Sequence, residues 1–237
     1  MGGIGPGIMD LVSPMLVKTI EKSDIIIGYK KYLGLIDKRL LQGKEIKSFN
    51  MQKEVERAKF AVSKALEGKV VTVVSSGDPG VYGMASLVIE EAVKSKVEVE
   101  VIPGITAALA AASLLGSPLT LDFAVISLSD ILVTWESIEN KLKALSLADI
   151  VIVIYNPASS KRRWQLQAAV DIILENRKST TPTGIVKNCY RNSQEVIITE
   201  LARLKDYDID MNTIIIIGNS ETIILDGMMI NPRGYKK

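Results

Sequence analysis

The chain has 237 residues, 47% of them hydrophobic, with one cysteine and no histidine, so it is long enough for one large domain or two small ones. A single thiol excludes an internal disulfide and an iron–sulfur cluster. The lack of histidine excludes Ser-His-Asp or Cys-His catalysis and an imidazole zinc site. We therefore expect no metal held by the protein. The 29 basic and 27 acidic residues give a formal charge of +2, which argues against a nucleic-acid partner.

The N-terminal segment and the apolar runs carry no targeting or membrane signal. The first residues, MGGIGPG, do not combine a charged region with an apolar stretch, as a signal peptide does. Apolar runs such as Ile214–Ile217 are far too short to span a bilayer. We therefore expect a soluble cytoplasmic protein without a membrane partner.

Short β-branched runs alternate along the chain with longer segments of helical period. Continuous apolar runs such as IVIVIY and TIIIIG are typical of strands buried on both faces, which favours an α/β fold with parallel pairing. The predicted strands, in order, are 25–28, 45–49, 70–75, 97–102, 123–128, 150–155, 183–187, 195–199 and 213–218.

Helices are predicted between these strands, over 8–22, 52–67, 83–95, 105–115, 135–146 and 160–176. The fourth of them ends at Gly116, which is followed by Ser117 and Pro118, a helix stop and a breaker. This stretch divides the chain into two halves of similar size. We therefore predict two α/β domains, 1–116 and 117–237.

The first glycine-rich turn is Gly3-Ile4-Gly5-Pro6-Gly7, directly before a predicted helix. Such a turn allows a ligand to approach the backbone and directs helix N–H groups toward it. The spacing is not that of the dinucleotide fingerprint, and Pro6 removes a donor. A plain glycine turn explains this motif equally well.

A second loop, SSGDPGVYG over 75–83, follows a buried strand. In open α/β sheets ligands bind outside the carboxyl ends of strands, and Asp78 can accept hydrogen bonds from an amine or a ribose there. A turn stabilised by an Asp side chain is the alternative.

Three further segments repeat this layout of a buried strand that ends in polar groups. They are VIPGITA over 101–107, where Thr106 can either cap a helix or touch a ligand, Tyr155-Asn156-Pro157, and GIVKNCYR over 184–191. Each is a weak signal alone, but together the five segments indicate a ligand site.

In this order and with these spacings, the five segments resemble the tetrapyrrole methylase family. The narrower resemblance, to C(17)-methyltransferases of precorrin-3 type substrates in cobalamin biosynthesis, depends on SSGDPGVYGMA, VIPGITA, ISLSD, YNPxSxxR, PTGIVKNCYR, IIIIGNS and NPRGY. The resemblance covers nearly the whole chain. It implies two α/β domains with S-adenosylmethionine bound in a cleft between them, S-adenosylhomocysteine as product, a small-molecule tetrapyrrole as acceptor, and a homodimer.

The resemblance also implies cofactor contacts at matching positions. These are Pro6, Ser76, Gly77, Asp78, Val81, Thr106, Ala107, Asn156, Val186, Asn188 and Cys189. Family members usually begin with an apolar strand before the first glycine loop, whereas here only Met1 and Gly2 precede Gly3. We therefore expect a missing strand in the first sheet, unless the true start lies further upstream.

An electron-rich macrocycle edged with carboxylates needs cations to hold it. Arg162, Arg163 and Arg191 are the candidates for substrate binding, because guanidinium groups grip carboxylates in a bidentate manner. The resemblance also implies ring contraction, a step that benefits from proton transfer, and Asp78 and Asp130 are the acidic candidates for it. For each of them a role as turn former is the alternative.

Rival functions remain open at this point. Another member of the superfamily could methylate a different tetrapyrrole carbon, or act on ribosomal RNA or a modified histidine. A non-catalytic module that senses S-adenosylmethionine would bind the cofactor without turnover. A nicotinamide oxidoreductase is disfavoured by the glycine spacing.

Overall fold

The computed structural model describes residues 1–159 and 162–235 and divides the chain into two compact units. The first unit covers Met1–Ala107 and the second begins at Ala108. The sequence placed the division after Gly116 instead. The helix before Gly116 belongs to the second unit because Leu115 packs against Gly184, and Gly116 itself pairs with Met229.

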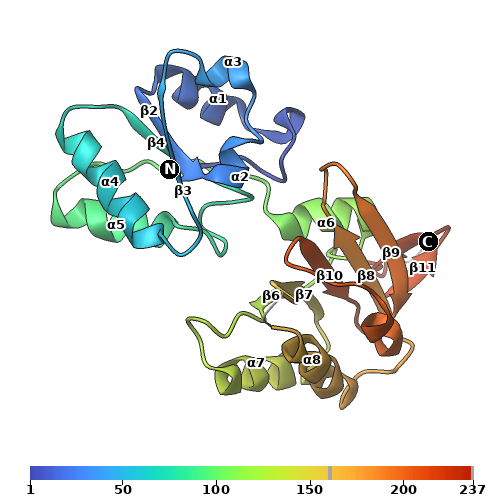
Figure 1. The fold of residues 1–237 in the computed structure, drawn as a ribbon. Helices are drawn as coiled ribbons and strands as arrows, with labels where there is room; N and C mark the ends of the chain where they lie inside the picture. The colour runs from blue at the N-terminus through green and yellow to red at the C-terminus, as the bar shows by residue number, and fades with distance from the viewer. Residues whose placement is uncertain (160–161, 236–237) are drawn as a thin grey trace. The chain divides into compact units, whose positions relative to one another are not determined.

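The first unit contains a four-stranded, wholly parallel sheet in the order β1-β4-β2-β3 (Figure 1). Its strands are β1 (Gly2–Gly3), β2 (Ile25–Tyr29), β3 (Glu45–Phe49) and β4 (Val71–Ser75). The helical segments are a 3-10 turn at Met9–Leu11, α1 (Pro14–Lys22), α2 (Lys30–Leu33), α3 (Lys38–Leu41), α4 (Glu54–Leu66) and α5 (Ala85–Lys94).

Helices cover both faces of this sheet, and strand β2 explains why. Ile25 and Ile27 point into a cluster with residues of α4 and α5, such as Ala61 and Val88. Ile26, on the opposite face, joins a second cluster that includes Leu16 of α1. Successive side chains of a strand alternate between faces, so an uninterrupted isoleucine run requires an apolar layer on each side.

Two predictions for the first unit were wrong in detail. The helix expected over 8–22 is broken, because Ser13 is extended and caps a helix that begins only at Pro14. The segment 97–102 is not a strand: only Ile102 pairs, in a single parallel bridge to Gly2. The strand that we expected to be missing before the first glycine loop is present as β1. It is only two residues long and therefore offers the segment 97–102 few backbone partners.

The second unit contains a five-stranded mixed sheet in the order β6-β7-β10-β8-β9. Its strands are β6 (Phe123–Ser127), β7 (Val151–Tyr155), β8 (Pro182–Lys187), β9 (Glu195–Glu200) and β10 (Thr213–Ile217). Only β6 and β7 pair in parallel, and the other pairs are antiparallel. Parallel pairing was therefore predicted correctly for the first unit and incorrectly for most of the second, since a buried central strand is equally apolar in either orientation.

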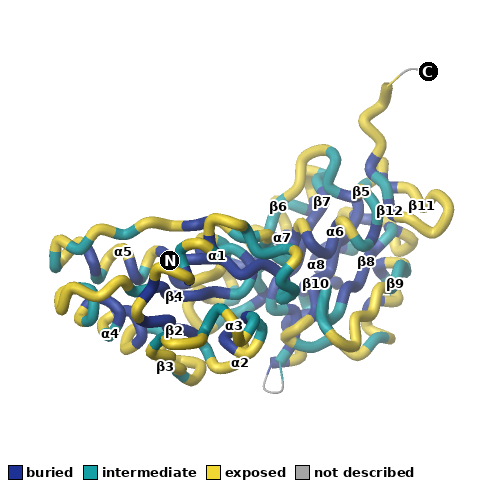
Figure 2. Tube along the Cα trace, turned by 90° about the horizontal axis from the view of Figure 1, so that it is seen from above, coloured by how far each residue is buried: buried dark blue, intermediate teal, exposed yellow. Residues whose placement is uncertain are grey.

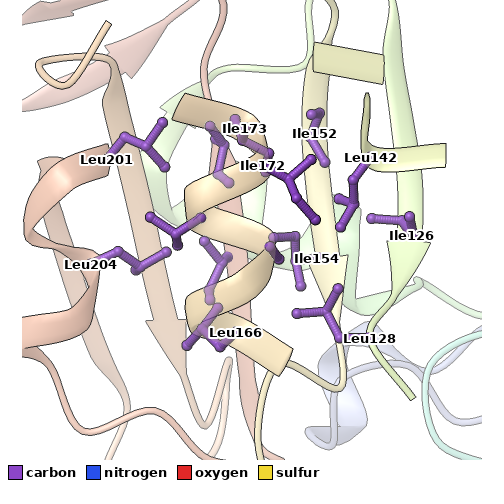
Figure 3. Close-up of a cluster of buried hydrophobic side chains, with 14 of the residues drawn as sticks. Ile126, Leu128, Leu142, Ile152, Ile154, Leu166, Ile172, Ile173, Leu201 and Leu204 are labelled. Carbon is purple, nitrogen blue, oxygen red and sulfur yellow. The ribbon is translucent and has the colours of Figure 1, made fainter. Parts of the chain in front are cut away.

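The core of the second unit lies between this sheet and α7 (Trp135–Leu147), α8 (Trp164–Leu174) and a 3-10 segment, Leu201–Asp206. Figure 3 shows Ile152 and Ile154 of β7 pointing toward Ile172 and Ile173 of α8. On the opposite face lies α6 (Ala107–Leu115), whose Leu115 occupies the space left by Gly184 of β8; a Cβ there would lie 2.3 Å from the Leu115 Cδ1 atom.

A small three-stranded sheet completes the second unit. It consists of β5 (Gly116–Ser117), β11 (Ile223–Leu225) and β12 (Met228–Ile230), in the order β11-β12-β5. All three residues of β11 are exposed although they are aliphatic, and Figure 2 shows this hairpin as a mainly exposed segment. Within the described residues, no helix is both long and apolar enough to cross a membrane.

Candidate functional site

Three loops of the first unit meet at the carboxyl end of its parallel sheet. They follow β1, β4 and the 97–102 segment, and they are joined by backbone hydrogen bonds. Gly5 and Gly77 exchange two such bonds, of 3.2 and 2.8 Å, and the Ile4 N–H donates to the Ser75 carbonyl at 2.9 Å. The Gly3 N–H donates to the carbonyl of Ile102 at 3.1 Å. The loops therefore form one hydrogen-bonded frame.

Glycine is required in this frame because backbone lies directly against backbone. A Cβ on Gly104 would lie 2.3 Å from the Gly77 carbonyl oxygen and 2.6 Å from that of Gly3. A Cβ on Gly3 would lie 2.5 Å from the same Gly77 oxygen. Gly77 itself has a φ of +62°, which disfavours other residues. These glycines allow the loops to approach one another, a requirement separate from the approach of a ligand.

Asp78 fastens two of the loops together. One carboxylate oxygen accepts from the Gly80 N–H at 2.8 Å, and the other accepts from the Gly104 N–H at 3.0 Å. Hydrogen bonds to a charged acceptor are stronger than neutral ones, so this clasp contributes to the order of the loops. The turn-forming alternative raised for Asp78 thus has a direct geometric basis, and each carboxylate oxygen retains capacity for one further donor.

The remaining predicted cofactor residues of the first unit lie on the same frame. Pro6 is buried, whereas Ser76, Val81, Thr106 and Ala107 are half-buried. Besides the Asp78 carboxylate, this frame therefore offers backbone amides and the Ser76 and Thr106 hydroxyls. This donor set fits an adenosine-type ligand, which is recognised by apolar contact and a few directed hydrogen bonds.

Residues after β6, β7 and β8 gather at one edge of the second unit's sheet. The register explains this: β10 pairs with both β7 and β8, and each is antiparallel to it, so β7 and β8 end at the same edge. Strand β6 runs parallel to β7, and Ser127 lies opposite Tyr155. The structure therefore brings Asn156 and Asn188 to a common edge of this sheet.

Asn156 is held in place at the end of β7. It has a φ of +50°, a conformation that Asn tolerates better than most residues. Its side-chain amide donates to the Ser127 hydroxyl at 2.9 Å. Its carbonyl oxygen accepts from the Arg162 guanidinium at 3.1 Å.

The two neighbouring arginines differ sharply in environment. Arg162 is buried, and besides Asn156 its guanidinium donates to the Leu128 carbonyl at 3.3 Å. Arg163 is exposed. This geometry supports a structural role for Arg162 at the strand ends and leaves Arg163 as the more accessible of the two cations.

Asp130 is half-buried, and one of its carboxylate oxygens accepts from the side-chain amide of Gln165 at 2.9 Å. Gln165 is buried in α8, and its own carbonyl oxygen has no hydrogen-bond partner among the described residues. Asp130 is thus fixed by one oxygen, while the other oxygen is left for a further interaction.

The segment after β8 presents mainly backbone. Val186 is fully buried within the strand, and Asn188 has a φ of +51° and accepts from the Arg191 N–H at 2.8 Å through its carbonyl. Burial raises the pKa of the Cys189 thiol to about 12, although the nearby Arg191 charge acts in the opposite direction. Cys189 is therefore neutral at physiological pH, which makes it unsuited as a nucleophile.

Three residues of this region were not predicted as site residues. Ser127 fixes the Asn156 amide, and Gln165 fixes Asp130. The hydroxyl of Tyr155 accepts from the Ala108 N–H at 2.7 Å and so caps α6. Ser127 and Tyr155 lie within motifs that the sequence singled out, but nothing in the local sequence indicates Gln165, because its contact spans 35 residues.

Comparisons with known proteins agree on one family. The family model described as Tetrapyrrole (Corrin/Porphyrin) Methylases matches residues 3–205. A probable cobalt-factor III C(17)-methyltransferase of Salmonella typhimurium is 42% identical over 98% of this chain and 97% of its own length. The crystal structure of the methyltransferase CobJ is 33% identical, with a TM-score of 0.90 and coverage of 98% of each chain.

A cobalt-factor III methyltransferase of Priestia megaterium is 45% identical over 99% of this chain. The chain spans only 44% of that relative's length, so such relatives carry additional sequence. The narrower resemblance to C(17)-methyltransferases is confirmed by the names of these relatives, and the two-domain α/β fold by the structural match. The chain belongs to the tetrapyrrole methylase family.

Proposed function

We propose that this protein is an S-adenosylmethionine-dependent C-methyltransferase that methylates C(17) of a precorrin-3 type tetrapyrrole, with ring contraction, in cobalamin biosynthesis. The observation that carries the proposal is the end-to-end similarity to the Salmonella relative. The CobJ structure also supports it, because its fold matches over nearly the whole chain.

The loop frame of the first unit is the proposed cofactor site. Ser76, Thr106 and the backbone of Gly77, Val81 and Ala107 would hold the nucleoside. The cofactor supplies an activated methyl group on a sulfonium. The role of the chain is alignment, and holding donor and acceptor in line can lower a barrier by roughly 7–11 kcal/mol.

The hydrogen-bonded frame suits this role because alignment requires a site whose loops are held in place. Asp78 acts here as a positioning residue, since its two oxygens hold Gly80 and Gly104. Asn156, Val186, Asn188 and Cys189 remain proposed cofactor contacts of the second unit. For Val186 and Cys189, which are buried, those contacts would be made by the backbone.

The acceptor side of the proposal assigns Arg163 and Arg191 to the tetrapyrrole carboxylates. Arg162, by contrast, would act through Asn156, whose carbonyl it holds. For ring contraction, Asp130 is the better acidic candidate of the two, because only one of its oxygens has a hydrogen-bond partner within the side-chain contacts described above.

A homodimer is part of the proposal, and an exposed apolar hairpin of the second unit is the structural reason for it. The β11–β12 hairpin exposes Ile223, Ile224, Leu225 and Met228. An aliphatic edge strand of this kind is usually covered, because it offers both apolar surface and unpaired backbone groups. We propose that a second copy of the chain covers this hairpin.

We also propose a cytoplasmic location, because a single cysteine agrees with a reducing compartment.

The decisive experiment is an anaerobic incubation of the protein with S-adenosylmethionine and cobalt-factor III, followed by mass spectrometry. We expect a mass gain of one methylene in the tetrapyrrole and an equal amount of S-adenosylhomocysteine. Tight cofactor binding without any methylated product from cobalt-factor III, cobalt-precorrin-3 or precorrin-3B would refute the proposed activity. A product methylated at another carbon, identified by NMR, would refute the C(17) assignment alone.

A further inference from the structure

A short loop of the second unit exposes three consecutive aliphatic side chains. Ile131, Leu132 and Val133 connect β6 to α7, and their exposed fractions are 75%, 95% and 40%. Single exposed apolar residues are common on protein surfaces, but a contiguous run with polar surroundings marks an interaction site. We refer to residues 131–133 as the apolar loop.

The apolar loop is fixed at both of its ends to the start of α8. On one side, Asp130 accepts a hydrogen bond from Gln165 at 2.9 Å. On the other side, the rings of Trp135 and Trp164 pack edge to face, with centroids 4.8 Å apart. Both ends of the apolar loop are therefore held in place against α8, and its three side chains are exposed at a fixed position on the surface.

Polar and aromatic groups beside this base complete a distinctive surface. Trp164 is 55% exposed, and Arg163 next to it is also exposed. Apolar side chains, an aromatic ring and a cation thus lie at one end of α8. The same region carries Asp130 and the strand ends of β6 and β7, where ligands of α/β sheets bind.

We propose that the apolar loop and Trp164 form a platform for one face of the tetrapyrrole macrocycle, and that Arg163 pairs with a carboxylate at its rim. This inference rests on the proposed function and identifies the part of the second unit that holds the acceptor. A flat apolar ligand edged with carboxylates matches the surface in both polarity and charge. A second copy of the chain matches it less well, because the β11–β12 hairpin, with its four exposed apolar side chains, is already the proposed surface for that purpose.

The test uses Leu132→Ser, with Leu147→Ser as the matched control. Leu147 is an exposed leucine at the opposite end of α7 in the same unit. Because Leu132 is nearly fully exposed, its replacement leaves the core intact, and unfolding curves of both variants check this. The measurements are KM for cobalt-factor III, the dissociation constant for S-adenosylmethionine, and the molecular mass in solution.

Binding of the tetrapyrrole is followed directly by tryptophan fluorescence. The chain has two tryptophans, and both lie at this platform, so a bound tetrapyrrole quenches them. We expect Leu132→Ser to raise KM and the midpoint of quenching about tenfold, the order expected when a leucine contact is lost. Arg163→Gln should also raise KM, and both variants should bind S-adenosylmethionine like the wild type.

Each outcome is decisive. Turnover by the wild type with the same KM in Leu132→Ser and Leu147→Ser overturns the platform while the proposed function stands. If Leu132→Ser lowers the mass of the assembly in solution and leaves KM unchanged, the apolar loop contacts a second copy of the chain instead. Neither binding nor turnover of cobalt-factor III by the wild type overturns both the platform and the proposed acceptor.

Discussion

Replacement of Gly104 by alanine should separate the loops that form the proposed cofactor site. The new Cβ would lie 2.3 Å from the Gly77 carbonyl oxygen and 2.6 Å from that of Gly3, and both are backbone atoms that cannot rotate away. Overpacking of this kind costs about 1–3 kcal/mol. If the shift also breaks the 3.0 Å bond from the Gly104 N–H to Asp78, a further loss of about 1.5–3 kcal/mol follows.

We therefore expect Gly104→Ala to lower the free energy of unfolding by about 2.5–6 kcal/mol when both terms apply. At roughly 2–4 °C per kcal/mol for a chain of this size, Tm should fall by about 5–24 °C. Affinity for S-adenosylhomocysteine should fall as well, because the displaced loops hold the nucleoside contacts.

The matched control is Gly34→Ala, also in the first unit. Gly34 has a φ of −70°, which alanine adopts readily, and a Cβ there would have its nearest neighbour at 3.5 Å. This variant should be as stable as the wild type or slightly more stable. Calorimetry and titration with S-adenosylhomocysteine measure both effects. If Gly104→Ala matches Gly34→Ala in Tm and in affinity, the loops are not packed against each other as described.

Three further predictions concern Asp78, the arginine pair and Cys189. Asp78→Asn should lower the free energy of unfolding by about 1–3 kcal/mol, since an amide cannot accept hydrogen bonds at both positions. Urea denaturation measures the loss. An unchanged free energy of unfolding would show that Asp78 does not hold the two loops together. Arg162→Ala should lower the free energy of unfolding by about 2–4 kcal/mol, because it leaves buried carbonyls unpaired. Arg163→Ala should leave Tm unchanged and raise KM for the tetrapyrrole. The reverse pattern would contradict the assigned roles. The native Cys189 thiol should resist iodoacetamide at pH 8 and react once the chain is unfolded. Because its folded pKa of about 12 lies above the unfolded value, the stability that it contributes is complete below the unfolded pKa and is lost as pH rises toward 12. Wild type should therefore lose more stability than Cys189→Ala between pH 8 and 10.5, and equal losses would contradict the raised pKa.

Much of the fold could be predicted from local pattern. Continuous isoleucine and valine runs identified β2, β4, β7 and β10, because a strand covered on both faces needs apolar residues at every position. The same pattern could not give the direction of β10, whose pairing with β7 and β8 is antiparallel. It also gave no sign of β5, β11 and β12, which are too short for a periodicity.

The sequence predicted the loops of the candidate site but not the contacts that each of their residues makes. Glycine-rich strand ends marked the loops, yet Gly3 and Gly104 are required for the approach of loop to loop. Arg162 and Arg163 were indistinguishable in the sequence. Only the structure separates a buried guanidinium bound to carbonyl oxygens from an exposed one.

By itself, the sequence determined the α/β class, the order of most strands and helices, the motifs of the family, and the absence of histidine chemistry. These properties depend on composition and on residues that are close together along the chain. The tertiary structure decided strand direction, the clasp of Asp78 on Gly104, and the pairing of Gln165 with Asp130. The physical reason is distance along the chain: each of these features joins segments whose contact is set by the packing of whole elements, and no local pattern encodes it.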